Sequence, residues 1–187
     1  MEVPILETPR LLLKKYDLNS YGLVFSEKSD SEIMGIFGYS EPEELEREKS
    51  LFREQYSYFF RLLAHFQLVL KETGSTIGSA GFHNWHPYHR KAELGYSLRG
   101  EQYKNKGYMS EAVGPIIQFG FETLRLHRIE AQVEPRNDVS LHMVRKFGFT
   151  EEGLLRENYF FTDHFEDSLI FRLLEPEWRK ASGNVIP

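Results

Sequence analysis

Residues 102 to 112 read Gln-Tyr-Lys-Asn-Lys-Gly-Tyr-Met-Ser-Glu-Ala, a polar turn with one glycine that leads into an apolar helix. The turn follows a predicted strand at Lys91–Leu98. A strand, a glycine-bearing loop and a helix in this order direct several backbone N–H groups to one point. The helix dipole and the charges of Lys104 and Lys106 make that point positive, so it suits a phosphate. Ordinary surface turns share this composition, so the flanking sequence has to distinguish a phosphate-binding loop from a plain turn.

The composition is that of a globular domain. The chain has 187 residues, of which 41% are hydrophobic and 27% charged, enough to bury a full core. No apolar run approaches the ~20 residues of a membrane helix, and the start of the chain lacks a signal-peptide pattern. Without cysteine, disulfides, thiol nucleophiles and cysteine zinc sites are excluded. We expect one domain over residues 1–187, with its core at about 10–178, in the cytoplasm.

The first half of the chain predicts hairpins and helices. Arg10–Tyr16 is a candidate strand, and Asp17 is a candidate N-cap of a short helix. Glycines at 35 and 38 suggest a break, after which Ser40 and Glu43 fit a capping box. A long amphipathic helix follows on the spacing of Leu45, Phe52, Tyr56, Phe59 and Leu63. The segments 66–71 and 76–83 form a predicted hairpin through Glu72–Ser75.

The second half predicts alternating strands and helices. After Lys91–Leu98, a helix carries Ala112, Ile116, Phe119 and Leu124, with a bend expected at Pro115. His127–Glu134 alternates like a half-buried strand, and the next helix is capped near Asn137 and ended by Gly148. Two last strands are expected at about 152–160 and 167–174. This order predicts an α+β fold whose mixed sheet has parallel pairing in its middle.

Five motifs of the second half come in the order and spacing of a known family. The chain resembles the GNAT superfamily of acetyl-CoA-dependent N-acetyltransferases, and within it the branch of ribosomal-protein-alanine N-acetyltransferases. The resemblance implies a single GNAT domain with about seven strands and about four helices, and with a sheet splayed between the fourth and fifth strands. The motifs are Ala92–Tyr96, Lys106–Ala112, Leu126–Ala131, Asn137–Ser140 and Lys146–Phe149.

The resemblance also implies where acetyl-CoA, as co-substrate, would lie. Backbone groups of Tyr96, Ser97 and Leu98 would bond the pantetheine amides, as in strand addition. The pyrophosphate would lie on the phosphate loop, which we define by Lys104, Asn105, Lys106, Gly107, Tyr108, Met109 and Ser110. Asn137 resembles the asparagine that bonds the pantetheine arm, although a helix cap explains it equally well.

The phosphate loop departs from the usual family pattern. Only Gly107 remains of the glycine-rich motif, so the Met109 side chain must point away from the cofactor. Val144 stands where many relatives have a tyrosine that protonates the leaving thiolate. These departures keep open a protein that binds CoA without catalysis.

The resemblance assigns the chemistry to two residues outside the loop. Glu93 would be the general base, directly or through water; the alternatives are an outward-facing charge or a salt bridge to Lys91 or Arg99. Ser140 would donate a hydrogen bond to the thiolate, or alternatively be satisfied within its own helix. His83, His86 and His89 have no metal-site spacing, so we expect no metal there.

The expected activity is acetyl transfer to a primary amine, most simply the N-terminal amine of a protein. A polyamine or aminoglycoside acceptor remains an alternative. The net charge of -5 suits a cationic acceptor and argues against nucleic acid as a partner. Relatives lead us to expect a possible homodimer or higher homo-oligomer.

Overall fold

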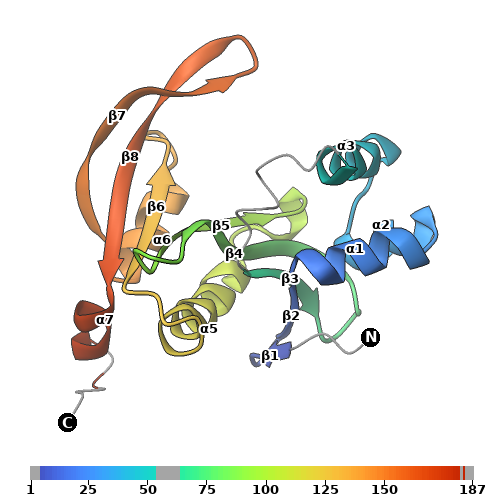
Figure 1. The fold of residues 1–187 in the computed structure, drawn as a ribbon, viewed down its shortest axis with the longest axis horizontal. Helices are drawn as coiled ribbons and strands as arrows, with labels where there is room; N and C mark the ends of the chain where they lie inside the picture. Colours follow the sequence, from blue (N-terminus) through green and yellow to red (C-terminus); the bar gives the residue numbers. More distant parts are fainter. Residues whose placement is uncertain (1–4, 54–63, 182, 184–187) are drawn as a thin grey trace. The chain divides into compact units, whose positions relative to one another are not determined.

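The structure is a computed structural model that describes residues 5–53, 64–181 and 183. It has an α+β fold, as predicted, and its described residues include eight strands and six α-helices. The strands form one mixed sheet in the order β1-β2-β3-β4-β5-β6-β8-β7 (Figure 1). The chain divides into two compact units: residues 1–85 with 95–116, called unit 1, and residues 86–94 with 117–187, called unit 2.

Unit 1 begins with antiparallel strands. β1 (Ile5–Glu7) pairs with β2 (Leu11–Tyr16), which pairs with β3 (Ala64–Leu70), and β3 pairs with β4 (Thr76–His86). The predicted first strand and hairpin are therefore confirmed. The short edge strand β1 was not predicted, and it contributes to a strand count above the expected seven.

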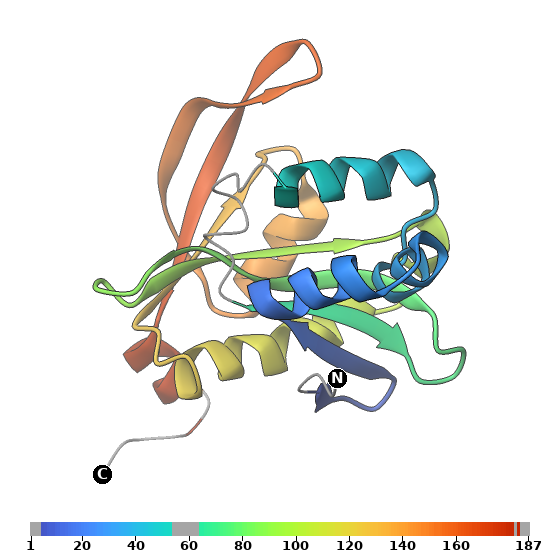
Figure 2. The same ribbon diagram turned by 45° about the vertical axis from the view of Figure 1, so that its right-hand side comes forward.

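Three helices of unit 1 cover an aromatic core. α1 (Leu18–Glu27) and α2 (Asp30–Phe37) lie along the strands of this unit, and α3 (Pro42–Arg53) follows them (Figure 2). The core cluster shared by β2 and these helices consists of Tyr16, Tyr21, Val24, Ile33, Phe37 and Leu45. Asp17 accepts a hydrogen bond from the N–H of Ser20, so the predicted N-cap of α1 is confirmed.

Two predictions for this region need correction. The predicted break is confirmed at Gly38, which ends α2 with a φ of 72°. Gly35, however, lies inside α2, because the burial of Ile33 and Phe37 outweighs the ~1 kcal/mol that glycine costs in a helix. Ser40 and Glu43 do not form the capping box: α3 starts at Pro42, and the Ser40 N–H donates to Glu44 instead. The predicted continuation of this helix through Tyr56, Phe59 and Leu63 lies outside the described residues.

β5 (Lys91–Leu98) and α5 (Tyr108–Glu122) each contribute several residues to both units. β5 has the predicted bounds, and α5 starts within the predicted turn and continues through Pro115. The proline therefore does not end the helix. A 3₁₀ turn, η1 (Glu101–Tyr103), lies between them.

Unit 2 consists of the remaining strands and helices. β6 (Arg128–Val133), α6 (Asp138–Lys146), β7 (Thr150–Phe161), β8 (His164–Leu174) and α7 (Glu175–Ala181) follow in order. β8 pairs antiparallel with both β6 and β7, and the β7–β8 hairpin extends past the end of β6 (Figure 1). The strands and the helix predicted here are confirmed, including the end of α6 at Gly148, whose φ is 80°.

The parallel pairing predicted for the middle of the sheet is short. β5 pairs with β6 at three positions: Lys91 with Arg128, Ala92 with Ile129, and Glu93 with Glu130. The parallel pairing is therefore limited to the first three residues of β5. Of the helices in the described part of the chain, none combines the length and apolar character needed to span a bilayer.

Candidate functional site

The second half of β5 lines a pocket in unit 1. The pocket has a volume of about 270 Å³ and its lining includes Tyr96 and Ser97, two residues predicted to contact the cofactor. Leu98, the third, is half-buried and follows them in the strand. Gly95 is needed for shape, because a Cβ at this position would come within 2.9 Å of the His83 ring. The full lining is His65, Ser79, Ala80, Gly81, His83, Gly95, Tyr96 and Ser97.

His65 is a pocket residue that the sequence did not reveal. Its Nδ1 atom lies 2.7 Å from the hydroxyl oxygen of Tyr21, which comes from α1, 44 positions earlier in the chain. Burial, together with the charges of Arg99 and His83, lowers the pKa of His65 to about 4. The ring is therefore neutral at physiological pH. A single histidine in an apolar strand carries no sequence signal that it lines a pocket.

The phosphate loop places its backbone in unusual conformations. Asn105 and Gly107 have φ angles of 58° and 77°, in the left-handed region that favours glycine and tolerates asparagine. Residues 104–107 are exposed, and α5 begins directly after them at Tyr108. The first-turn N–H groups of a helix lack partners within the helix, so this loop and helix end present donors to an anion.

The side chains of the phosphate loop differ in their environment. Met109 is 6% exposed and lies in the core, as the sequence required of a loop that offers its backbone to a ligand. Tyr108 and Ser110 are half-buried. Lys104 forms an ion pair with Glu101 in η1, and Lys106 is exposed.

Arg10 and Glu111 brace the phosphate loop, and the sequence analysis missed both. Glu111 accepts from Arg10 Nε at 2.6 Å, from the Arg10 backbone N–H at 2.8 Å and from Thr8 Oγ1 at 2.6 Å. Arg10 also donates to the carbonyl of Lys106 at 3.0 Å, and its guanidinium lies 4.4 Å from the centre of the Tyr108 ring. Arg10 thus fixes the loop and adds positive charge beside it.

The carboxyl group of Glu111 is held in its charged form. Burial raises its pKa, but the hydrogen bonds from Thr8 and Arg10 outweigh burial and lower the pKa below its usual range. The partners are 101 to 103 positions apart in sequence, so no local pattern could have linked them.

Glu93 belongs to unit 2 and is buried, with 6% of its surface exposed. The alternative of an outward-facing charge is therefore wrong. Its Oε2 atom accepts from Gln132 Nε2 of β6 at 3.3 Å. The cations named as alternative partners both have other carboxylates: Lys91 pairs with Glu130 at 3.3 Å and Arg99 with Glu44 at 3.6 Å.

Asn137 and Ser140 meet at the start of α6. The Asn137 side chain accepts from the Ser140 N–H at 3.0 Å, which confirms the predicted helix cap. This bond uses Oδ1 of Asn137 and leaves Nδ2 as a donor on an exposed residue. Ser140 is half-buried, and Val144, where the acid tyrosine of many relatives would stand, is a core residue with 1% exposure.

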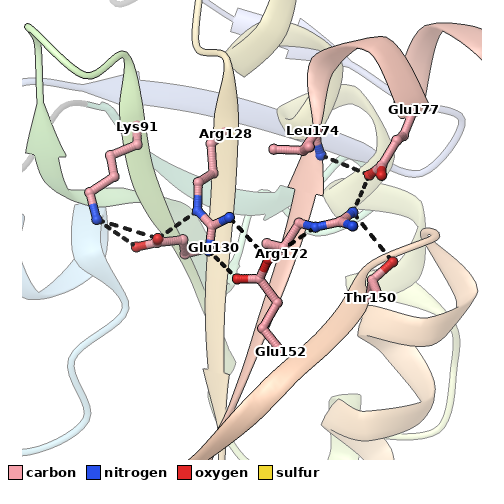
Figure 3. Close-up of polar contacts among 8 residues, drawn as sticks. All are labelled: Lys91, Arg128, Glu130, Thr150, Glu152, Arg172, Leu174 and Glu177. Carbon is pink, nitrogen blue, oxygen red and sulfur yellow. Dashed lines mark hydrogen bonds and ion pairs between the residues drawn. The ribbon is translucent and has the colours of Figure 1, made fainter.

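A charge network crosses the strands of unit 2 near Glu93. Glu130 takes ion pairs from Lys91 and Arg128, and Arg128 also pairs with Glu152 (Figure 3). The network continues through Arg172, which pairs with Glu152 and Glu177 and donates to Thr150 (Figure 3). Opposite charges alternate along it, so it neutralises itself. Within residues 5–53, 64–181 and 183, no group of three or more acidic, histidine or cysteine side chains could hold a metal ion.

Comparison with known proteins shows the family of this chain. The model of the acetyltransferase (GNAT) domain family matches residues 10–150. That span includes β5, the phosphate loop and α6, and it covers most of the chain. The chain therefore belongs to the GNAT acetyltransferase family, and it is an acyltransferase that transfers acetyl groups.

Individual relatives support the same assignment. The uncharacterized N-acetyltransferase p20 of Bacillus licheniformis is 32% identical over 92% of this chain and 97% of its own length. The [ribosomal protein uS5]-alanine N-acetyltransferase of Escherichia coli is 32% identical over 46% of this chain and 43% of its own. A crystal structure of a GNAT-family acetyltransferase from Bacillus anthracis covers 93% of this chain and all of that one, with a TM-score of 0.65 and 25% identity.

Proposed function

We propose that this acetyltransferase uses acetyl-CoA to acetylate the N-terminal amine of a protein. The observation that carries the proposal is the phosphate loop: left-handed Asn105 and Gly107, the helix start at Tyr108, and the Arg10 charge beside them. The family match spans residues of both units, which supports a single acetyltransferase domain.

The cofactor would be held mainly by backbone groups. The pyrophosphate suits the N–H groups from Lys106 to Ser110, where the helix dipole and Arg10 offset its charge. The pantetheine amides suit the backbone of Tyr96, Ser97 and Leu98 in the manner of an added strand. Asn137 would donate through Nδ2 while its Oδ1 remains the cap of α6.

The chemistry would rest on Glu93 and Ser140. The amine nitrogen attacks the thioester carbon, its proton passes to the Glu93 carboxylate directly or through water, and the C–S bond breaks to release the CoA thiolate. Ser140 would stabilise this thiolate by a hydrogen bond, because a hydroxyl is a good donor but a weak acid. The burial of Glu93 and its hydrogen bond from Gln132 support a base role, since both restrict the position of the carboxylate.

The acceptor class is supported by similarity rather than by a contact. The uS5-alanine acetyltransferase of E. coli matches about half of this chain, over 85 residues. The net charge of -5 suits an acceptor that arrives as a cation, as a protein N-terminus does.

Thiol release from acetyl-CoA tests the proposal. Peptides that begin with alanine should give turnover, and the same peptides with a blocked N-terminus should give none. Turnover with spermidine or an aminoglycoside but with no peptide would replace the acceptor class, and no turnover with any amine would overturn the function.

A matched pair of glycine variants tests the phosphate loop. Gly107→Ala should raise the KM for acetyl-CoA about 10-fold, because its Cβ is strained and lies where the backbone meets the phosphates. Gly74→Ala is the control, since Gly74 has a φ of 72°, close to the 77° of Gly107, and has open space around it in a hairpin turn. Equal effects of the two substitutions on KM would contradict the proposed phosphate seat.

A further inference from the structure

Gln132 links Glu93 to the β7–β8 hairpin within unit 2. Its Nε2 donates to Glu93 Oε2 at 3.3 Å, while its Oε1 accepts from Asn158 Nδ2 at 2.7 Å and from the Tyr159 hydroxyl at 3.2 Å. Asn158 Nδ2 also lies 3.2 Å from Ser168 Oγ, and Ser168 is buried. Both ends of the Gln132 amide are therefore engaged by named partners.

A bulge in β7 makes this linkage possible. In the pairing with β8, Leu155 is opposite Ser168 and Tyr159 is opposite Glu166, so extra residues of β7 bulge between them. Glu157, inside the bulge, has a φ of 52°, and its N–H donates to Asp167 Oδ1 at 2.8 Å. Bulges re-aim side chains, and this one lets Asn158 reach β6 across β8.

The partners of Gln132 determine which atom meets Glu93. A glutamine amide carries an acceptor oxygen and a donor nitrogen, and Asn158 and Tyr159 both donate to the oxygen. The nitrogen is then the atom that faces Glu93, and a nitrogen donor stabilises the charged carboxylate over the neutral acid. Burial acts in the opposite direction, because it penalises the charged form.

We propose that Gln132 is a positioning residue that orients the Glu93 carboxylate and keeps it able to accept a proton, with Asn158 and Tyr159 holding the amide in place. This inference rests on the base role proposed for Glu93. Gln132 does not touch the reacting atoms; it acts through Glu93.

The charged neighbours of Glu93 in unit 2 are already paired. Glu130 of β6 is opposite Glu93, and it is balanced by Lys91 of β5 and Arg128 of β6. Arg172 of β8 pairs with Glu152 of β7 and with Glu177 of α7. The Tyr159 hydroxyl of β7 donates to Gln132. Substituting Gln132 leaves these ion pairs in place, so its effect on Glu93 can be measured separately.

The test is the pH profile of acetyl transfer by Gln132→Met in the full chain. We expect kcat/KM near neutral pH to fall about 10- to 100-fold, the loss expected for a hydrogen bond to a charged group. The loss should be in kcat, with the KM for acetyl-CoA unchanged. The acidic limb of the pH profile should move to higher pH. The difference in kcat/KM from the wild type should shrink as the pH rises, because Glu93 is then deprotonated in both enzymes.

Matched variants separate positioning from folding. Asn158→Ala should shift the profile in the same direction by a smaller amount. Gln118→Met should leave the pH profile unchanged. It removes a hydrogen bond of the same kind, from Gln118 Nε2 to Glu122 Oε2 at 2.9 Å, on an exposed face of α5. Thermal melts of each variant report folding separately.

Two outcomes overturn the inference. One is a Gln132→Met enzyme with wild-type kcat and pH profile; the other is a uniform loss at all pH values, which indicates a structural role only. In both, wild-type turnover persists and the proposed function stands. An absence of wild-type turnover, or full activity of Glu93→Gln, would instead contradict the proposed function.

Discussion

Glu93 and Glu130 lie opposite each other on β5 and β6, yet their surroundings differ in kind. Glu130 is bracketed by two cations, with Lys91 Nζ at 3.3 Å and Arg128 Nε at 2.7 Å. Glu93 receives a hydrogen bond from the neutral amide of Gln132, which is held by further neutral groups. Glu130 is thus held by two cations, whereas the Gln132 contact of Glu93 is a hydrogen bond from a neutral amide.

The difference separates a structural carboxylate from a candidate base. The Glu130 carboxylate is engaged by Lys91 and Arg128, so its interactions serve to hold β5 and β6 together. The Glu93 carboxylate is oriented by the Gln132 amide, an arrangement that suits the base role proposed for it. Stability should therefore depend on Glu130 and turnover on Glu93.

The largest expected effect is on turnover. Glu93→Gln should lower kcat by about 100- to 10,000-fold, the usual contribution of a general base. Glu130→Gln, the same substitution on the facing strand, should change kcat only a few-fold. Thiol-release kinetics with saturating acetyl-CoA measure both. Similar losses in the two variants would remove the distinction between them.

The next effect is on stability, where Glu130→Gln should have a larger effect than Glu93→Gln. Glu130→Gln should lower the free energy of unfolding by about 1–3 kcal/mol, because it leaves Lys91 and Arg128 without their shared carboxylate. Denaturant unfolding of both variants provides the comparison. A Glu93→Gln protein less stable than Glu130→Gln would contradict the assignment of Glu130 to structure.

A smaller effect concerns acid. The hydrogen bond from Arg128, aided by Arg172 and opposed by burial, lowers the pKa of Glu152 from its ordinary 4.5. A carboxyl group whose pKa is lowered by folding adds stability that is fully present above pH 4.5 and is lost as the pH falls through the lower value of the folded state. Glu152→Gln should therefore flatten the loss of stability in this window.

Unfolding free energies measured in steps from pH 6 to about pH 3 test this effect. Salt at about 1 M should weaken the wild-type dependence as well, because it screens partly exposed ion pairs. Parallel curves for the wild type and Glu152→Gln would show that the charge network does not determine acid stability.

The smallest effect is expected at Tyr159. Tyr159→Phe removes one of two donors to the Gln132 oxygen, and Asn158 still holds the amide at 2.7 Å. Turnover should fall about two-fold, the consequence of losing one weak neutral hydrogen bond. Steady-state kinetics of Tyr159→Phe and Asn158→Ala compare the two donors. The shorter bond is that of Asn158, so a larger loss of turnover in Tyr159→Phe would contradict this prediction.

Local features of the fold were predictable from sequence. The bounds of β5, the hairpin of β3 and β4, the Asn137 cap and the Gly148 end each depend on a few consecutive residues. Side-chain periodicity and capping act over one turn or one strand, so a sequence carries them directly. The order of these motifs also allowed the family to be identified.

The errors arose where packing overrode local preference. α2 contains Gly35, which suggested a break, and its start at Asp30 is marked by the Ser29 and Glu32 capping box, a local signal that was not predicted. The edge strand β1 is only three residues long and depends on pairing with β2. Neither could be recognised from composition alone.

The sequence by itself indicated the family and most of the order of elements, and it singled out Glu93, Ser140 and the phosphate loop as the candidate site. Only the tertiary structure decided how these residues are supported: Arg10 and Glu111 are 101 positions apart, and Gln132 reaches Glu93 over 39. The physical reason is that strand register and a bulge in β7 fix which side chains meet, and both depend on pairing between distant strands rather than on neighbouring residues.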